Sequence, residues 1–163
     1  MKSVIRIAQI KFVPELFKID ENHARLMTVL DEVKEHRPDV VITPECFLDG
    51  LLLMKEGITM KGLSEYAIDP ETSSHAQEVS QWAGDNNSWF VLGCCTNRPE
   101  GVYNSAEIFN RTGERIGIYD KVHSGGGVTC QAMNYRCSTP TSGSSGCSSA
   151  PIAAGRRRSE RSR

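Results

Sequence analysis

A glutamate placed directly after an apolar run is the first residue of this sequence that could do chemistry. Glu45 follows the β-branched run 40–42, which lies between Pro38 and Pro44 and is typical of a short buried strand. In open α/β sheets, ligands and catalytic groups gather just beyond the ends of strands. Pro44 restricts the backbone in front of the carboxylate and so directs the side chain. Glu45 is therefore a candidate catalytic residue, although a solvated loop glutamate has the same local pattern.

A lysine follows a second strand-like run much later in the chain. Lys121 lies in the stretch 117–123, after residues with the pattern of a strand. A lysine at the end of a strand is, taken alone, more often a solvated surface residue than a catalytic one. Lys121 therefore becomes a candidate only together with Glu45.

Six cysteines offer thiols, but their spacing indicates no site. No two of them have the Cys-x-x-Cys spacing of a zinc site, and no disulfide framework is indicated, so we expect no metal or other cofactor. Cys94 and Cys95 lie in a strand-like run and are interpreted as small core residues. Cys130, Cys137 and Cys147 have no helix start or basic neighbour that would lower a thiol pKa. None of these thiols is predicted to be a nucleophile, and neither is Cys46, which adjoins Glu45.

A strand–helix–strand unit must position the carboxylate. A first strand is expected over residues 4–10, and a helix over 20–37 with Asp20 as its N-cap. Pro38 ends this helix, and the strand 39–42 follows. The apolar stripe expected to face the core consists of Ala24, Met27, Leu30 and Val33. This alternation predicts an α/β fold.

The next part of the chain continues the same class. A second helix is expected after an N-cap at Thr72 or Ser73. Its inward residues would be Ala76, Val79 and Ala83. Further strands are expected over 89–94, 102–109 and 115–121, the last two forming a hairpin around 110–114. The segment 48–64 fits either a short helix or a packed loop.

Composition and charge limit the class of protein. A chain of 163 residues with a formal net charge of −1 suits one globular domain and argues against a nucleic-acid partner. No apolar run has the length of a membrane span, and the N-terminus has no signal peptide, so we expect a cytoplasmic protein without a membrane partner. Residues 124–163 are rich in Gly, Ser, Thr, Pro and Arg and lack periodicity, so this tail is predicted to be irregular and disordered.

Residues 1–123 resemble the N-terminal part of a domain of the nitrilase superfamily, the carbon-nitrogen hydrolases. The resemblance rests on the opening strand, the Pro44-Glu45 segment, and the short segments 91–93, 103–106 and 119–123, which occur together in the family's order. It implies an α-β-β-α sandwich, incomplete in this chain, and an intact relative that is a homo-oligomer. It further implies hydrolysis by a Glu-Lys-Cys triad, in which Glu45 is the general base and Lys121 the cation.

The third member of that triad has no counterpart in the chain as written. In the family, the nucleophilic cysteine lies well beyond the lysine, in a setting similar to Cys-x-Asp-x-Arg-x-Pro-Glu. The coding sequence can also be read in the frame that begins one nucleotide earlier. In that frame, the codons of residues 148–157 can encode Ile-Cys-Ala-Asp-Arg-Arg-Trp-Pro-Glu. We therefore expect that one nucleotide is missing near the codon of His123 and that the tail comes from a shifted frame. The cysteine of this segment is called the alternate-frame cysteine below.

Two functions follow from these patterns. The first is hydrolysis of a small amide, N-carbamoyl compound or nitrile, with an amidase or N-carbamoyl amidohydrolase favoured over a nitrilase and this chain inactive. The second is a non-catalytic scaffold whose arginine- and serine-rich end, 156–163, contacts nucleic acid. The second function rests on a single short basic patch on a near-neutral chain, and the shifted frame explains the same arginines more simply.

Overall fold

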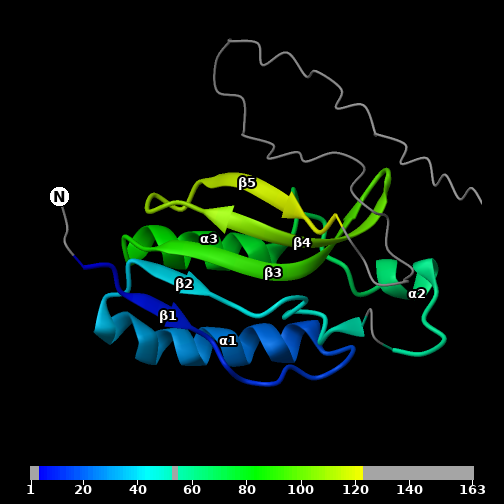
Figure 1. Cartoon of the computed structure of the whole chain (residues 1–163), viewed down its shortest axis with the longest axis horizontal. Helices are drawn as coiled ribbons and strands as arrows, with labels where there is room; N and C mark the ends of the chain where they lie inside the picture. The colour runs from blue at the N-terminus through cyan, green and yellow to red at the C-terminus, as the bar shows by residue number, and fades with distance from the viewer. Residues whose placement is uncertain (1–3, 53–54, 123–163) are drawn as a thin grey trace, which may run out of the picture.

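The computed structural model describes residues 4–52 and 55–122, which form a layered α/β unit (Figure 1). The strands are β1 (Ile7–Gln9), β2 (Val40–Ile42), β3 (Trp89–Arg98), β4 (Gly101–Phe109) and β5 (Arg115–Asp120). The helices are α1 (Ile19–Val33), the 3-10 helix η1 (Lys34–His36), α2 (Met60–Ser64) and α3 (Ser74–Asp85). None of the helices described is long and apolar enough to cross a membrane. The predictions for the tail 124–163, including its shifted frame and its basic end, lie outside the described residues.

The five strands form one sheet in the order in which they occur along the chain. β1 pairs with β2 and β2 with β3 in parallel, whereas β3–β4 and β4–β5 are antiparallel. Parallel neighbours need a crossover connection, and α1 and α3 provide the two crossovers. The predicted α/β class, the first strand–helix–strand unit and the later hairpin are confirmed.

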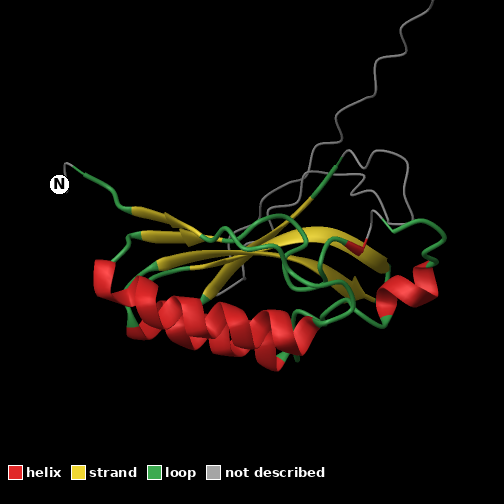
Figure 2. Ribbon diagram, turned by 90° about the horizontal axis from the view of Figure 1, so that it is seen from below, coloured by secondary structure: helices red, strands yellow, loops and turns green. Residues whose placement is uncertain are grey.

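Both long helices pack on the same face of the sheet (Figure 2). Their buried residues meet those of β2 and β3 in one core cluster, where each fully buried aliphatic or aromatic side chain contributes about 1.5–3 kcal/mol. Its fully buried members include Leu26 and Leu30 of α1, Val79 and Ala83 of α3, and Val41, Phe90 and Leu92 of the sheet. The described residues therefore form one helical layer and one sheet layer of the α-β-β-α sandwich that the resemblance implies.

The inward face of α1 is confirmed for Leu30, which is fully buried, and for Met27 and Val33, which pack against the core cluster, but not for Ala24. Ala24 is exposed, and the buried residues of the helix are Asn22, His23, Leu26 and Leu30. Asn22 faces inward because its amide nitrogen donates to the carbonyls of Glu15, at 2.8 Å, and Leu48, at 2.9 Å. These bonds join the helix to two loops, a long-range contact that periodicity does not indicate. The N-cap also differs, because it is Lys18, without a side-chain cap, and Asp20 lies in the first turn.

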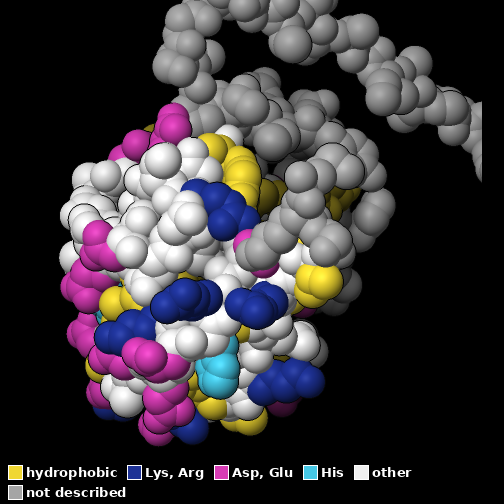
Figure 3. Space-filling view, turned by 90° about the vertical axis from the view of Figure 1, so that its left-hand side faces the viewer, with side chains coloured by type: hydrophobic (Ala, Val, Ile, Leu, Met, Phe, Trp, Pro, Cys, Tyr) yellow, Lys and Arg dark blue, Asp and Glu magenta, His cyan; other side chains and the backbone are white. Residues whose placement is uncertain are grey.

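The end of the molecule at which β3 begins carries side chains of both charges (Figure 3). There the guanidinium of Arg111 donates to the carboxylate of Asp39, Nη2 to Oδ1, at 2.9 Å. Its other nitrogen, Nη1, donates to the carbonyl of Asn87 at 2.7 Å. Asp39 is buried, so Arg111 provides the opposite charge that a buried carboxylate requires.

A second buried carboxylate lies between β4 and β5. Glu107 is fully buried, with one oxygen 3.4 Å from Nη1 of Arg115 and the other accepting a weak hydrogen bond from the thiol of Cys94. Arg115 also contacts Glu71 and the carbonyl of Pro70, so its charge is shared. Burial raises the pKa of Glu107 to about 7, against the lowering effect of Arg115.

This carboxyl should make the fold less stable as the pH rises. The pKa of Glu107 is about 7 in the folded protein, above the ordinary value of 4.5. The contribution of this group to the free energy of unfolding is therefore complete below pH 4.5 and is lost as the pH rises through 7. We expect the free energy of unfolding to fall by up to about 3 kcal/mol between pH 5 and 8 from this group. Urea denaturation at several pH values measures it. Glu107→Gln should flatten the slope of the free energy of unfolding against pH, whereas the exposed control Glu32→Gln should keep the parental slope. Equal slopes in the parent and both variants would show that Glu107 is not the group responsible.

Candidate functional site

Glu45, Lys121 and Asn104 come together at the end of the sheet where β2 and β5 finish. Glu45 follows β2 after Thr43 and Pro44, and Lys121 follows β5 directly. Asn104 lies within β4, and its carbonyl accepts the backbone N–H of Lys121 at 2.8 Å. The β4–β5 pairing thus extends as far as the lysine and fixes where its side chain begins.

The two nitrogen groups donate to the same oxygen of the glutamate. Nζ of Lys121 lies 2.7 Å from Oε1 of Glu45, and Nδ2 of Asn104 lies 2.5 Å from the same atom. Among the residues described, no donor contacts Oε2. This second oxygen is therefore available to accept a proton from a bound group.

The charges of the pair stabilise one another. The hydrogen bond from Lys121 lowers the pKa of Glu45, and Asn104 lowers it further. The hydrogen bond to Glu45 in turn raises the pKa of Lys121. Both groups are therefore ionised at neutral pH, and the carboxylate is a base held beside a fixed cation.

These side chains line a hollow of about 230 Å³. Val91, Ala106 and Tyr119 supply apolar surface around it. The side chains of Glu45 and Lys121 are 49% and 43% exposed, so the hollow is open to water.

No thiol among the described residues reaches the hollow. Cys46 follows Glu45, but its side chain is fully buried in a cluster with Leu52, Leu63 and Val102. Cys94 and Cys95 are also buried, as predicted for core residues. The described residues thus bring the predicted base and cation together without a nucleophile.

Gly93 of β3 allows the loop that carries Glu45 to lie against the sheet. A Cβ at this position would lie 2.1 Å from the carbonyl oxygen of Pro44 and 3.2 Å from the Cα of Glu45. The N–H of Gly93 donates to Oγ1 of Thr43 at 2.8 Å, and its carbonyl accepts the N–H of Phe47 at 2.9 Å. The loop is thus held on both sides of the glutamate by one residue that has no side chain.

Gly93→Ala is therefore expected to displace the loop and destabilise the fold. Overpacking of this kind costs about 1–3 kcal/mol of the free energy of unfolding, and urea denaturation measures it. Gly62→Ala is the matched control, because the nearest atom to its added Cβ, at 3.1 Å, belongs to the flexible side chain of Ile58. If the two variants lost the same stability, the close approach at Gly93 would not be what matters.

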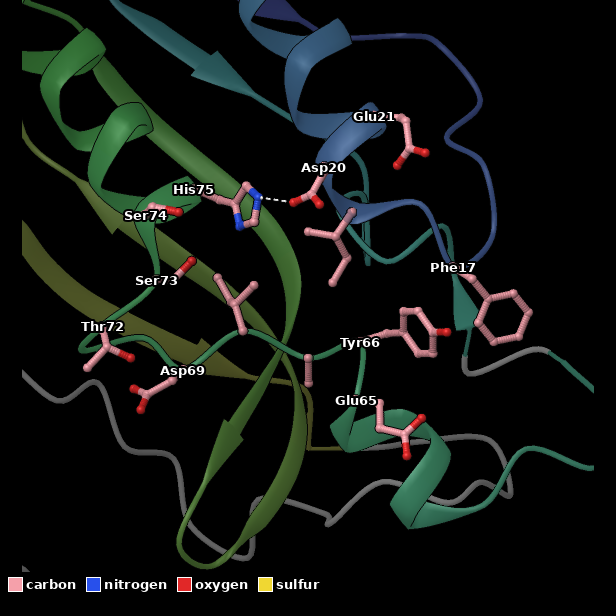
Figure 4. Close-up of a pocket in the computed structure, with 13 residues that line it drawn as sticks. Phe17, Asp20, Glu21, Glu65, Tyr66, Asp69, Thr72, Ser73, Ser74 and His75 are labelled. Atoms are coloured by element: carbon pink, nitrogen blue, oxygen red, sulfur yellow. Dashed lines mark hydrogen bonds and ion pairs between the residues drawn. The ribbon is translucent and has the colours of Figure 1, made fainter.

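A larger cavity, of about 490 Å³, lies at the N-terminal ends of α1 and α3 (Figure 4). Nε2 of His75 lies 2.8 Å from Oδ1 of Asp20 there, as Figure 4 shows. The hydroxyl of Ser73 accepts the N–H of Ala76 as the N-cap of α3, and no described serine is hydrogen-bonded to His75. The cavity therefore lacks a nucleophile paired with a base, and its size alone does not make it the reactive site.

Sequence reasoning missed the role of Asn104. Asn104 lies within the strand predicted over 102–109, and the structure shows that its side chain is a donor to Glu45. Glu45 and Asn104 are 59 residues apart, so no local pattern indicates the contact. The larger cavity likewise has no local signal, because distant segments build it.

Comparisons with known proteins show the family and the fold. A family model described as carbon-nitrogen hydrolase matches residues 5–132. No curated protein matches the sequence. The crystal structure of an N-terminal amidase is 21% identical with a TM-score of 0.64, and the match covers 74% of this chain and 28% of that one. An amidase from Nesterenkonia sp. is 19% identical with a TM-score of 0.56, over 75% of this chain and 44% of that one. At these identities the likeness shows the fold, and the chain spans less than half the length of either protein.

Proposed function

The chain belongs to the carbon-nitrogen hydrolase family, and from that premise we propose that Glu45 and Lys121 form the acid–base half of an amide-hydrolysing site. The observation that carries the proposal is the 2.7 Å contact between Nζ of Lys121 and Oε1 of Glu45, two residues 76 positions apart. This contact supports the proposal because it brings a carboxylate and an ammonium group together at the ends of two strands, beside one hollow.

The geometry suits catalysis through a thiol. The free oxygen of Glu45 takes the proton of an incoming thiol, and the thiolate attacks the carbonyl carbon of an amide. The ammonium of Lys121 stabilises the negative charge that develops on the tetrahedral intermediate. The carboxyl then gives its proton to the leaving amine, and Glu45 afterwards takes a proton from the water that hydrolyses the thioester.

We assign the nucleophile to the alternate-frame cysteine. The chain as written offers the hollow no thiol from its described residues, because Cys46, Cys94 and Cys95 are all buried. We therefore expect this chain to be inactive. Resequencing the gene across the codon of His123 tests the shifted frame, and an unaltered sequence with no missing base would refute it.

Amides and N-carbamoyl compounds are the proposed substrates, in preference to nitriles. The solved structures that share the fold are described as amidases. In both substrate classes a carbonyl oxygen becomes charged on attack, which is the charge that Lys121 is placed to stabilise. No described residue of the hollow selects one member of these classes.

The test is ammonia release by a frame-restored chain, in which one nucleotide is inserted after the codon of His123. We expect this chain to hydrolyse at least one compound of a panel of small amides and N-carbamoyl amino acids. The chain as written, and the frame-restored chain with serine in place of the alternate-frame cysteine, should release none. Equal activity of the chain as written would refute the assignment of the nucleophile.

Asn104 is expected to act as a positioning residue for Glu45. Asn104→Leu removes a donor to Oε1 and leaves the bond from Lys121 in place. Because Asn104 also lowers the pKa of Glu45, the acid limb of the pH–rate profile should move to higher pH. Ala106→Leu, which alters the apolar wall of the same hollow, is the control. A fall in rate without any shift in the profile would leave Asn104 a merely structural residue.

A further inference from the structure

Asp49 is a buried carboxylate without a cationic partner among the described residues. Three carboxylates of the described chain are buried, and two of them have an arginine: Asp39 pairs with Arg111, and Glu107 with Arg115. Asp49 is 1% exposed, and no lysine, arginine or histidine of the described residues pairs with it. Buried charges in proteins are paired or coordinate metals, so Asp49 lacks a counter-charge that the fold supplies elsewhere.

Two thiols lie beside this carboxylate. The sulfur atoms of Cys46 and Cys95 are 3.9 Å apart, and the two sulfurs and an oxygen of Asp49 all lie within 4.8 Å of one another. Two thiolates bound at about 2.3 Å to a tetrahedral zinc ion would be about 3.8 Å apart. The observed spacing therefore needs little change to receive such an ion.

The surroundings of Asp49 orient it as a ligand. Its Oδ1 accepts the N–H of Leu52 at 3.1 Å and its Oδ2 the N–H of Cys95 at 3.0 Å. Each oxygen keeps a lone pair for a metal ion, and hydrogen bonds of this kind fix the direction of ligating carboxylates. Apolar side chains, including Leu63 and Val102, enclose the two thiols.

We propose that Cys46, Asp49 and Cys95 bind a soft divalent cation of the zinc class. On binding, both thiols lose their protons to solvent and form two metal–sulfur bonds, while the carboxylate forms one metal–oxygen bond. A water molecule completes a tetrahedral set. The bound ion supplies the counter-charge of Asp49 and ties the loop after Glu45 to β3. This inference does not depend on the proposed hydrolase activity.

The test uses the full chain with serine in place of Cys130, Cys137 and Cys147, so that Cys46, Cys94 and Cys95 are its remaining thiols. Titration with Cd²⁺ is followed by the ultraviolet charge-transfer absorption of the thiolate–cadmium bond. We expect saturation at one ion per chain, displacement by Zn²⁺, and release of two protons per ion. Affinity should then rise by about a hundredfold per pH unit while both thiols are protonated.

Matched variants assign the ligands. Cys46→Ser and Cys95→Ala should each abolish the saturable absorption, and Asp49→Asn should weaken binding by at least tenfold. Cys94→Ser should bind as the parent does, because this buried thiol contacts Glu107 instead. Circular dichroism checks that each variant is folded. The proposal is overturned by a parent that shows no saturable absorption, by absorption that survives in both folded Cys46→Ser and Cys95→Ala, or by a Cys46–Cys95 disulfide in the parent purified under reducing conditions.

Discussion

Replacing Glu45 by glutamine is expected to lower kcat for amide hydrolysis by the frame-restored chain by about 10²- to 10⁴-fold. A positioned general base contributes about that much, and the neutral amide of glutamine cannot take the proton of a thiol. The fold should be almost unaffected, because the Glu45–Lys121 pair is half-exposed and pairs of this kind contribute at most about 1 kcal/mol. Ammonia release under saturating substrate measures the change.

Glu65→Gln is the control for this prediction. Glu65 is an exposed carboxylate that lines the larger cavity near α3, so its removal should leave kcat unchanged. A loss of activity in Glu65→Gln together with full activity in Glu45→Gln would indicate that the reactive site lies in the larger cavity instead.

Replacing Lys121 by methionine is expected to lower kcat by about 10²- to 10³-fold, the effect of removing one preorganised group that stabilises a developing oxyanion. It should also change the pH dependence. Lys121 lowers the pKa of Glu45 in the parent, so without the lysine that pKa rises. Because the base works only when ionised, the acid limb of the pH–rate profile should move to higher pH.

The matched control is Lys61→Met, which removes an exposed lysine from α2. Its pH–rate profile should overlay that of the frame-restored parent. If Lys121→Met lost activity but kept the parental profile, the lysine would not be the group that holds Glu45 ionised, and the ion pair would have another role.

Local sequence patterns predicted the positions of Glu45 and Lys121 because each residue follows a strand-like run. The β-branched run before Pro44 and the hairpin around 110–114 are local signals, and both segments form as predicted. The family resemblance then supplied the expectation that the two residues act together. Their contact is a property of the sheet order, in which β2 and β5 are separated by two strands.

The missed features all depend on contacts between distant segments. Asn104 donates to a glutamate 59 residues away, and Cys46 meets Cys95 across 49 residues, so neither contact has a local signature. On α1, the prediction failed for Ala24, which is exposed, and missed Asn22, which is buried by hydrogen bonds to loop carbonyls. Hydrophobic periodicity assigns apolar residues to the core and cannot identify a polar residue whose partners come from elsewhere.

The most direct test of the Glu45–Lys121 assignment is the mass of the frame-restored chain, quenched with acid during turnover of an amide. We predict an added acyl group on the peptide that contains the alternate-frame cysteine, and a much slower appearance of that group in Glu45→Gln. An acyl group on Cys46, Cys94 or Cys95, or equally fast acylation without Glu45, would contradict it.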